Sequence, residues 1–238
     1  MKPDANQTES CPSASRVAQL GVRQAVLPPS TSLTALSEAA RSWCAPLVIA
    51  GASEVFDFTK GYDAGRKLTA PFGIGRYDED RVGMYETSLF KGQAPEDRRT
   101  IHMGLDIGAA EGTPVFSPFN GEIFGTAKRT EAGDYGGTVI VKGSTAGAAI
   151  FSLLGHLSFA SADRWKAGDR VECGQLLGWL GSKKENGGWN PHLHWQLSRL
   201  EPLELDLPGA VSAKNRSLAR EIFPDPTDLL RAAIGGWR

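Results

Sequence analysis

The sequence predicts a mainly β fold, built on an antiparallel sheet with small helical additions at both ends. Three observations support this prediction. Short runs rich in Val, Ile, Leu and Phe recur from Thr100 onward, glycine-containing turns separate them, and residues 190–197 alternate polar and apolar side chains with a period of two. Strands at this regular spacing favour a β-sheet domain over alternating strands and helices.

Changes in composition divide the chain into four regions. We expect a flexible lead-in with a short helix at residues 1–45, which are rich in Ser, Pro, Gln and Ala. Residues 46–98 are expected to be an accessory segment packed on the core, residues 99–200 the sheet domain, and residues 201–238 a C-terminal extension with a helix.

The elements before the sheet domain have weaker signals. Ser30 to Ser32 can cap a short helix that reaches Trp43. Residues 46–50 form an apolar run typical of a buried strand, closed by Gly51. Residues 56–93 show no clear period, which predicts an irregular segment on the main sheet.

The sheet domain carries clearer hairpin signals. Asn120-Gly121 lies between apolar runs at 113–116 and 122–124, and Asn-Gly between such runs is a strong hairpin signal. Residues 138–141 and 149–154 are expected to form a second hairpin. Further strands are predicted at residues 170–172, 175–180 and 192–198.

The C-terminal extension contains one predicted helix. Asp225 supplies an N-cap and Pro226 a proline in the first turn. The apolar face of this helix, Leu229, Leu230 and Ile234, is expected to dock on the body, and Gly235 can end the helix.

Composition and charge exclude several classes of function. A length of 238 residues with 41% hydrophobic content suits one globular domain with extensions. A net charge of -1 and a pI near 6.4 give no reason to expect a nucleic-acid partner. No segment is long and apolar enough to be expected to span a bilayer.

The N-terminus and the cysteines bear on location. Residues 1–29 lack the apolar stretch of a secretory signal, so we expect a cytoplasmic protein or one exported by a signal-independent route. Cys11, Cys44 and Cys173 are odd in number and have no C-x-x-C spacing, so free thiols are the simplest expectation. Cys173 lies near the histidine motifs, but we interpret its surroundings as a turn and assign it a structural role.

All four histidines lie in three short motifs. These are His102-Met103-Gly104-Leu105-Asp106, Gly155-His156-Leu157 and His192-Leu193-His194. In a strand, His192, His194 and Gln196 would share one face. Any one motif alone is as consistent with a surface or core histidine, but three motifs that use every histidine indicate a metal site.

If His102 and Asp106 bind the same metal ion, the chain between them must bend. In a straight strand His102 and Asp106 would lie about 13 Å apart at roughly 3.3 Å per residue, so Gly104 must allow a bend. Two imidazoles and one carboxylate leave a fourth position for water, as in catalytic zinc sites, where water is activated near neutral pH. No glutamate is available in the motif as a base, so His156 and His192 are the natural candidates.

Residues 99–200 resemble the lysostaphin-type zinc endopeptidases, whose signature is His-x-x-x-Asp, then Gly/Ala-His-Leu, then His-Leu-His before an aromatic residue. The resemblance implies a groove over the sheet and one Zn²⁺ held by His102, Asp106 and His194. It further implies that His156 and His192 orient water and stabilise the tetrahedral intermediate.

Two departures from the family pattern affect the groove. Leu154 stands where many members have a tyrosine, and residues 184–190 form a longer loop that makes Trp189 and Asn190 candidates for substrate binding. This loop, with Phe72 to Tyr77 upstream, resembles a subgroup without signal peptides. Some relatives are held latent by an N-terminal segment, so residues 1–95 are a candidate for covering the cleft.

The sequence therefore predicts a zinc metalloendopeptidase or amidase acting on peptidoglycan-type or Gly/Ala-rich peptides through metal-activated water. Two alternatives remain. One is a cytosolic zinc amidohydrolase acting on an amide outside the cell wall, and the other is a peptide-binding module without turnover. The expected partner is a peptide or peptidoglycan-like substrate, and the oligomeric state stays open.

Overall fold

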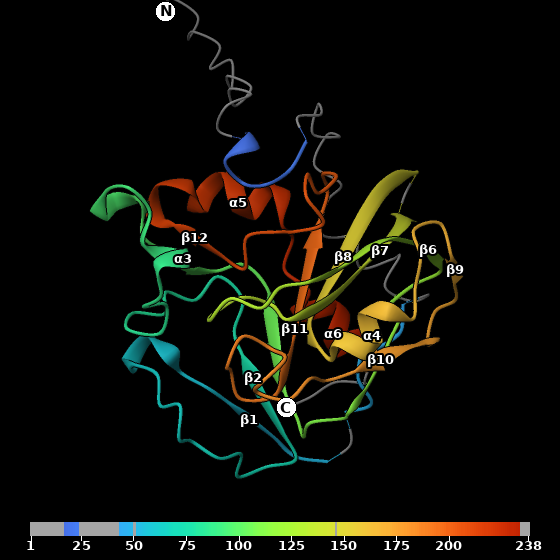
Figure 1. Cartoon of the computed structure of the whole chain (residues 1–238), viewed down its shortest axis with the longest axis horizontal. Coiled ribbons are helices and arrows are strands. Elements are labelled where there is room, and N and C mark those ends of the chain that lie inside the picture. The colour runs from blue at the N-terminus through green and yellow to red at the C-terminus, as the bar shows by residue number, and fades with distance from the viewer. Residues whose placement is uncertain (1–16, 24–42, 50, 146, 234–238) are drawn as a thin grey trace, which may run out of the picture.

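An eight-stranded sheet forms the centre of the molecule (Figure 1). The computed structural model describes residues 17–23, 43–49, 51–145 and 147–233. Along the sheet the strands follow the order β1-β2-β4-β11-β8-β7-β6-β9. Their bounds are Ser53–Val55 (β1), Phe72–Gly75 (β2), Leu105–Gly108 (β4), Gly121–Lys128 (β6), Gly137–Thr145 (β7), Ala148–Leu157 (β8), Arg170–Val171 (β9) and His192–Ser198 (β11).

Two short strand pairs and several short helices surround this sheet. The strand pairs are β5 (Pro114–Phe116) with β10 (Leu176–Trp179), and β3 (Arg99–His102) with β12 (Ala210–Ser212). The α-helices that lie wholly within the described residues are α3 (Ser88–Lys91), α4 (Phe159–Asp163), α5 (Arg216–Ile222) and α6 (Thr227–Ala233). The same residues contain three 3-10 helices, at Phe58–Lys60, Pro95–Asp97 and Ala213–Asn215.

The two faces of the sheet have different neighbours. Leu193, Trp195 and Leu197 of β11 point into one apolar core, where Leu229 and Leu230 of α6 also lie. On the other face, Leu153 of β8 packs in a second core that includes apolar residues of α5. Gly155 lies two residues after Leu153 in β8 and therefore shares its face of the sheet, and His194 of β11 lies opposite Gly155. The histidine cluster therefore lies on this second face, next to the second core.

The mainly β, antiparallel fold predicted from the sequence is confirmed, with one parallel pair, β1 with β2. The predicted hairpin of residues 138–154 is also confirmed as β7 and β8.

The hairpin predicted at Asn120-Gly121 is wrong. Strand β5 pairs with β10, whereas β6 pairs with β7 and β9. A Cβ on Gly121 would lie 2.2 Å from the carbonyl oxygen of Lys142 in β7. This glycine therefore permits the close approach of a neighbouring strand and does not form a hairpin turn.

The region before the sheet domain also differs from expectation. Residues 46–49 form no strand, and the run is not fully buried as expected, since Leu47 is buried but Val48 is 69% exposed. The segment expected to be irregular contributes β2, which lies between β1 and β4 in the main sheet. The predicted lead-in and its helix lie largely outside the described residues.

The predicted C-terminal helix is confirmed as α6. The Asp225 carboxylate accepts a hydrogen bond from the backbone N–H of Thr227 at 2.8 Å, and Leu229 and Leu230 are buried. Ile234 and Gly235 lie outside the described residues. Helix α5 and strand β12 had no recognised sequence signal.

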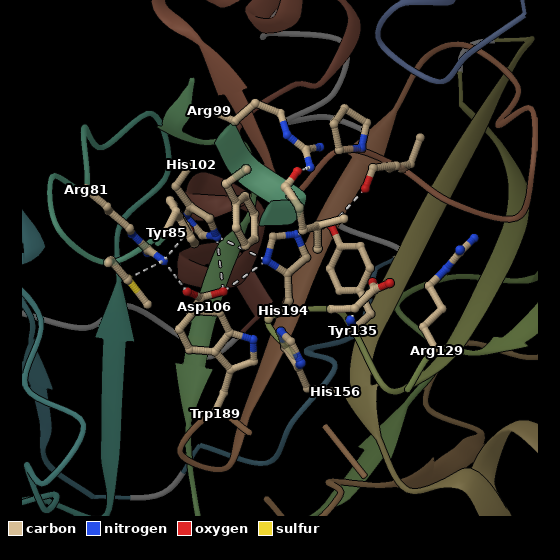
Figure 2. Close-up of a pocket in the computed structure, with 18 of the residues that line it drawn as sticks. Arg81, Tyr85, Arg99, His102, Asp106, Arg129, Tyr135, His156, Trp189 and His194 are labelled. Atoms are coloured by element: carbon tan, nitrogen blue, oxygen red, sulfur yellow. Dashed lines mark hydrogen bonds and ion pairs between the residues drawn. The ribbon is translucent and has the colours of Figure 1, made fainter. Parts of the chain in front are cut away.

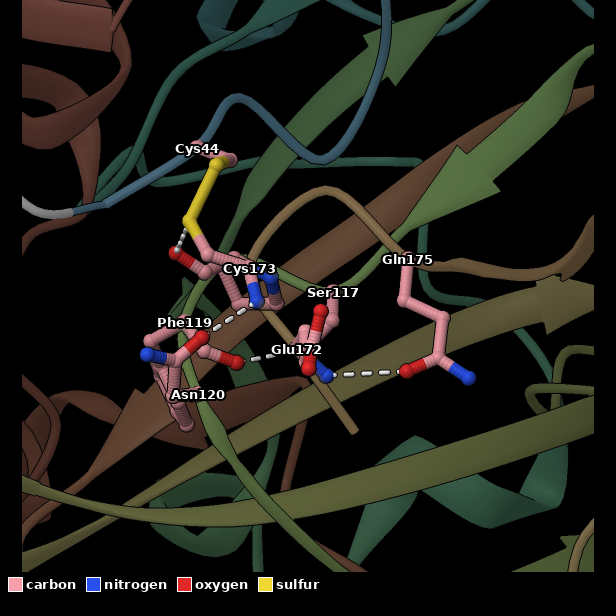
Figure 3. The surroundings of a disulfide bond; sticks show 8 residues. Cys44, Ser117, Phe119, Asn120, Glu172, Cys173 and Gln175 are labelled. Atoms are coloured by element: carbon pink, nitrogen blue, oxygen red, sulfur yellow. Dashed lines mark hydrogen bonds between the residues drawn. A yellow bond between two sulfur atoms is a disulfide. The ribbon is translucent and has the colours of Figure 1, made fainter. Parts of the chain in front are cut away.

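The expectation of free thiols is wrong for two of the three cysteines. Cys44 and Cys173 form a disulfide, which ties the segment before β1 to the turn before β10 (Figure 3). The backbone N–H of Cys173 also donates to the Asn120 side-chain oxygen at 2.7 Å. The two cysteines are 129 residues apart, so sequence spacing gave no indication of the pairing.

Helices in the described part of the chain are all too short or too polar to cross a bilayer.

We expect reduction of the disulfide to lower the free energy of unfolding by about 2–5 kcal/mol, because the cross-link restricts the unfolded chain. Urea unfolding with and without dithiothreitol measures this effect. The double variant Cys44→Ser/Cys173→Ser is the control and should not respond to the reductant. An equal response of wild type and variant would contradict the disulfide.

Candidate metal centre and active site

The pairing of β4 with β11 brings the central residues together. His194 lies directly opposite Asp106, and His192 lies opposite Gly108. His102 ends β3, and the chain bends at residues 103–104 before β4 begins. A Cβ on Gly104 would lie 2.4 Å from the His194 imidazole. Glycine at the expected bend thus also leaves room for the His194 ring.

Three side-chain atoms from these residues face a common point (Figure 2). His102 Nε2 lies 3.0 Å from His194 Nδ1 and 3.2 Å from Asp106 Oδ1, and the distance from His194 Nδ1 to Asp106 Oδ1 is 3.0 Å. Zinc ligands lie about 2.0–2.2 Å from the ion, so donors at this mutual spacing can share one cation. His102, Asp106 and His194 are all buried.

Hydrogen bonds outside this triangle fix the tautomers of both imidazoles. His102 Nδ1 lies 2.8 Å from the backbone carbonyl of Arg76, and His194 Nε2 lies 3.0 Å from Gln196 Oε1. The carbonyl oxygen can only accept, and Gln196 Oε1 is oriented by its amide, which donates to the Pro208 carbonyl at 3.4 Å. The outer nitrogens therefore carry the protons, and the unprotonated nitrogens face Asp106 as metal ligands require.

Arg81 holds the second oxygen of the Asp106 carboxylate. Its Nη1 donates to Asp106 Oδ2 at 2.6 Å and to the Tyr85 hydroxyl at 3.1 Å, and its Nε donates to Glu79 Oε2 at 3.1 Å. The Arg81 side chain is 1% exposed. Its charge is thus matched inside the protein, and Asp106 Oδ1 remains directed at the two histidines.

The charged surroundings keep Asp106 ionised and His102 neutral. Burial alone would raise the pKa of Asp106, but His102 and Arg81 outweigh it and hold this pKa well below its usual range. Burial, with Arg81 nearby, lowers the pKa of His102 to about 4. A carboxylate and a neutral imidazole are the protonation states that a metal site needs.

His156 and His192 lie beside this triangle with their ring centroids 4.2 Å apart. Their Nδ1 atoms contact the backbone carbonyls of Asn186 and Asn190 at 3.0 and 2.7 Å, so both carbonyls come from the long loop before β11. Each Nδ1 is therefore protonated, which leaves Nε2 as a base. Burial lowers the pKa of both imidazoles, so they are neutral near pH 7.

The backbone of His156 is in the left-handed region, with φ of 63°. Its N–H donates to the Tyr135 carbonyl at 2.8 Å, and its carbonyl accepts from Gly181 at 2.9 Å. These two bonds hold a conformation that a non-glycine residue rarely adopts, and such positions concentrate at functional sites.

Tyr135 lies beside His194, whereas Leu154, which stands where the family pattern often has a tyrosine, lies in the core on the opposite face of the sheet. The Tyr135 hydroxyl donates to the Leu207 carbonyl at 2.9 Å and lies 3.4 Å from His194 Nε2. Burial raises the pKa of Tyr135 well above its usual value, so the hydroxyl keeps its proton.

A cavity of about 290 Å³ opens above the cluster and is bordered by His102, Asp106, His156, His192 and His194. Trp189 and Tyr85 of the accessory segment line it beside Asp106 (Figure 2), and Phe90 also borders it. Arg99, Arg129 and Asp206 line the other side. The described part of the accessory segment therefore borders the cleft and leaves it open, in contrast to a segment that fills it.

The structure thus brings together all five side chains that the sequence assigned to the metal and to catalysis. It places Trp189 and Asn190 at the edge of the cleft, where Asn190 also orients His192 through its carbonyl. Three supporting side chains were missed: Arg81, Tyr135 and Gln196. Gln196 shares the β11 face with the histidines, and this pattern could have identified it, whereas nothing local in the sequence indicates Arg81.

We expect Arg81→Met to weaken binding of a divalent cation by about 10–100-fold, because Asp106 loses the partner that orients it. The measurement is competition with a chromophoric chelator. Arg216→Met, which removes an ion pair to Asp78 away from the site, is the matched control and should bind the cation as wild type does. Equal affinities for the two variants would contradict the role of Arg81.

Asp206 gives a prediction about stability and pH. Burial raises its pKa to about 6, above the ordinary value near 3.9. Because this pKa is raised in the folded state, the protonated carboxyl stabilises the fold below pH 4, and this contribution is lost as the pH rises through 6. Asparagine does not titrate, so Asp206→Asn should gain stability relative to wild type between pH 4 and 7, measured by urea unfolding. A difference in the free energy of unfolding between variant and wild type that stays constant over this range would contradict the shift.

The sheet domain is similar to known proteins. Residues 100–205 match the model of peptidase family M23. A DD-carboxypeptidase/endopeptidase Mpg of Neisseria meningitidis is 30% identical over 140 residues, which are 57% of this chain and 30% of the relative. The chain therefore spans under a third of the length of this curated relative.

Solved structures of similar proteins were also found. Lysostaphin from Staphylococcus simulans is 23% identical, with 58% of this chain and 46% of that chain covered and a TM-score of 0.36. A zinc containing peptidase from Vibrio cholerae is 26% identical, with 47% and 32% covered and a TM-score of 0.35. The segment that matches the family M23 model, residues 100–205, carries Asp106 and every histidine of the chain.

Proposed function

We propose that this protein is a zinc metalloendopeptidase that hydrolyses peptide bonds in peptidoglycan-type or other short peptides. The observation that carries the proposal is the triangle of His102 Nε2, Asp106 Oδ1 and His194 Nδ1, with 3.0–3.2 Å between its corners. Its unprotonated nitrogens and its ionised carboxylate suit one Zn²⁺. The family match supports hydrolysis of a peptide bond.

The zinc ion would supply a Lewis acid and a water molecule of lowered pKa. His156 and His192 are neutral and present Nε2 toward the cleft, so either can accept a proton from the attacking water. Once protonated, the same imidazole can donate to an oxyanion or to the leaving amine. Arg81 and Gln196 keep Asp106 and His194 oriented.

Two observations support a peptidoglycan-type substrate. The Neisseria relative is named as a DD-carboxypeptidase/endopeptidase. The Cys44–Cys173 disulfide favours an oxidising location, such as the periplasm or the cell surface, over the cytoplasmic location expected from the sequence. Cell-wall peptides are found in that location.

We expect chelation to abolish hydrolysis and added zinc to restore it, because the ion supplies the electrophile. His194→Ala should lose activity and also lose stoichiometric zinc, measured by elemental analysis of protein purified without added metal. Cleavage of muropeptides or oligopeptides that continues after chelation and in His194→Ala would end this proposal.

His156→Ala and His192→Ala are expected to retain zinc but lose at least about 10²-fold in kcat, since each removes a proton-transfer group. Zinc content and kcat are measured on the same preparations. A variant with normal kcat would exclude its histidine from proton transfer.

A further inference from the structure

Two rows of paired residues lie next to each other on the face of the sheet that carries Asp106 and His194, and one of them contains two glycines. Strand pairing places Gly75, Asp106 and His194 side by side in one row. Two residues away, Gly73, Gly108 and His192 form the adjacent row. The two rows are about 6.6 Å apart, which is within reach of a side chain flanking a bond held at the metal. The floor beside the site is thus free of side chains except His192.

A second cavity, of about 80 Å³, lies against this floor. His192 and Asp106 line both this cavity and the main cleft, so both cavities border the same proposed reactive centre. Its walls are apolar side chains of the accessory segment and of the long loop, namely Phe56, Phe58, Tyr62, Leu68, Met84 and Trp189.

The aromatic walls pack against one another and on the glycine floor. Tyr62 meets Trp189 edge-on with ring centroids 5.8 Å apart, and it also contacts Phe58 at 6.1 Å. A Cβ on Gly73 would lie 2.4 Å from the Phe56 ring, so only glycine lets this ring rest on the strand. The walls are therefore held in place before any ligand arrives.

Charged groups at the rim are already paired. Arg66 forms an ion pair with Glu54 at 3.0 Å and stacks over Phe56, and Asp63 accepts a hydrogen bond from the Gly65 N–H at 2.8 Å. Leu68, by contrast, is 37% exposed at the rim. A pocket with apolar walls and satisfied charges selects an apolar occupant.

We propose that this cavity, the apolar pocket, binds a branched aliphatic side chain of the substrate residue next to the cleaved bond. This inference rests on the proposed peptidase function and narrows its substrate class to the other short peptides, because peptidoglycan peptides carry no leucine-type side chain. A volume of 80 Å³ holds on the order of five to eight water-sized groups, which fits a leucine side chain and exceeds the single methyl of alanine.

The test uses the full-length protein with zinc and a panel of glycine-based hexapeptides with alanine or leucine at each position. Mass spectrometry locates the cleaved bond, and kcat/KM is measured for each peptide. We expect cleavage next to leucine, with kcat/KM about tenfold or more above that of the alanine peptide.

Two variants test the pocket itself. Leu68→Ala removes part of a wall and should reduce the preference for leucine several-fold. Leu203→Ala is the matched control, because Leu203 is also exposed, at 45%, and does not line the cavity. Gly108→Ala adds a methyl at the floor that meets only ordinary contacts at 3.5 Å or more, and it should shift the preference toward alanine.

Binding provides a readout that does not depend on hydrolysis. Titration of metal-free protein with N-acetyl-leucine amide should shift the Trp189 indole signal in NMR spectra, and N-acetyl-alanine amide should shift it less. Cleavage with no leucine preference would overturn the pocket while the peptidase proposal stands. Leucine-dependent binding without cleavage of any peptide would support the pocket and overturn the peptidase proposal.

Discussion

The two oxygens of the Asp106 carboxylate have different partners, and the rest of the site depends on this arrangement. One oxygen faces His102 and His194, and the other is held by Arg81 at 2.6 Å. A buried carboxylate without a partner would become protonated, and it would then fail as a ligand. Because Arg81 is itself buried and paired with Glu79, the protein fixes both the charge and the direction of Asp106.

This arrangement gives the accessory segment an integral role. Arg81 and the Arg76 carbonyl, which accepts from His102, both lie outside residues 100–205. The same segment provides β2, whose glycines let Phe56 and Arg81 pack directly against the sheet. Removing this segment would therefore remove contacts that orient two of the three proposed metal ligands, Asp106 and His102.

The long loop before β11 has a comparable role on the other side. Its carbonyls from Asn186 and Asn190 accept from the Nδ1 atoms of His156 and His192, the two proposed bases, and Trp189 contributes to both cavities. Loop and accessory segment meet where Trp189 packs against Tyr62 and Tyr85. The same loop thus orients the two imidazoles and forms part of the wall of the apolar pocket.

The sequence by itself determined the features that depend on local pattern. Alternation in residues 192–197 defined the faces of β11, and the histidine motifs with Gly104 identified the residues that the fold brings together. Tertiary structure alone decided the Cys44–Cys173 disulfide, the pairing of β5 with β10 and the contact of Arg81 with Asp106. Each of these joins segments far apart in the chain, and a long-range contact leaves no periodicity or spacing from which it could be deduced.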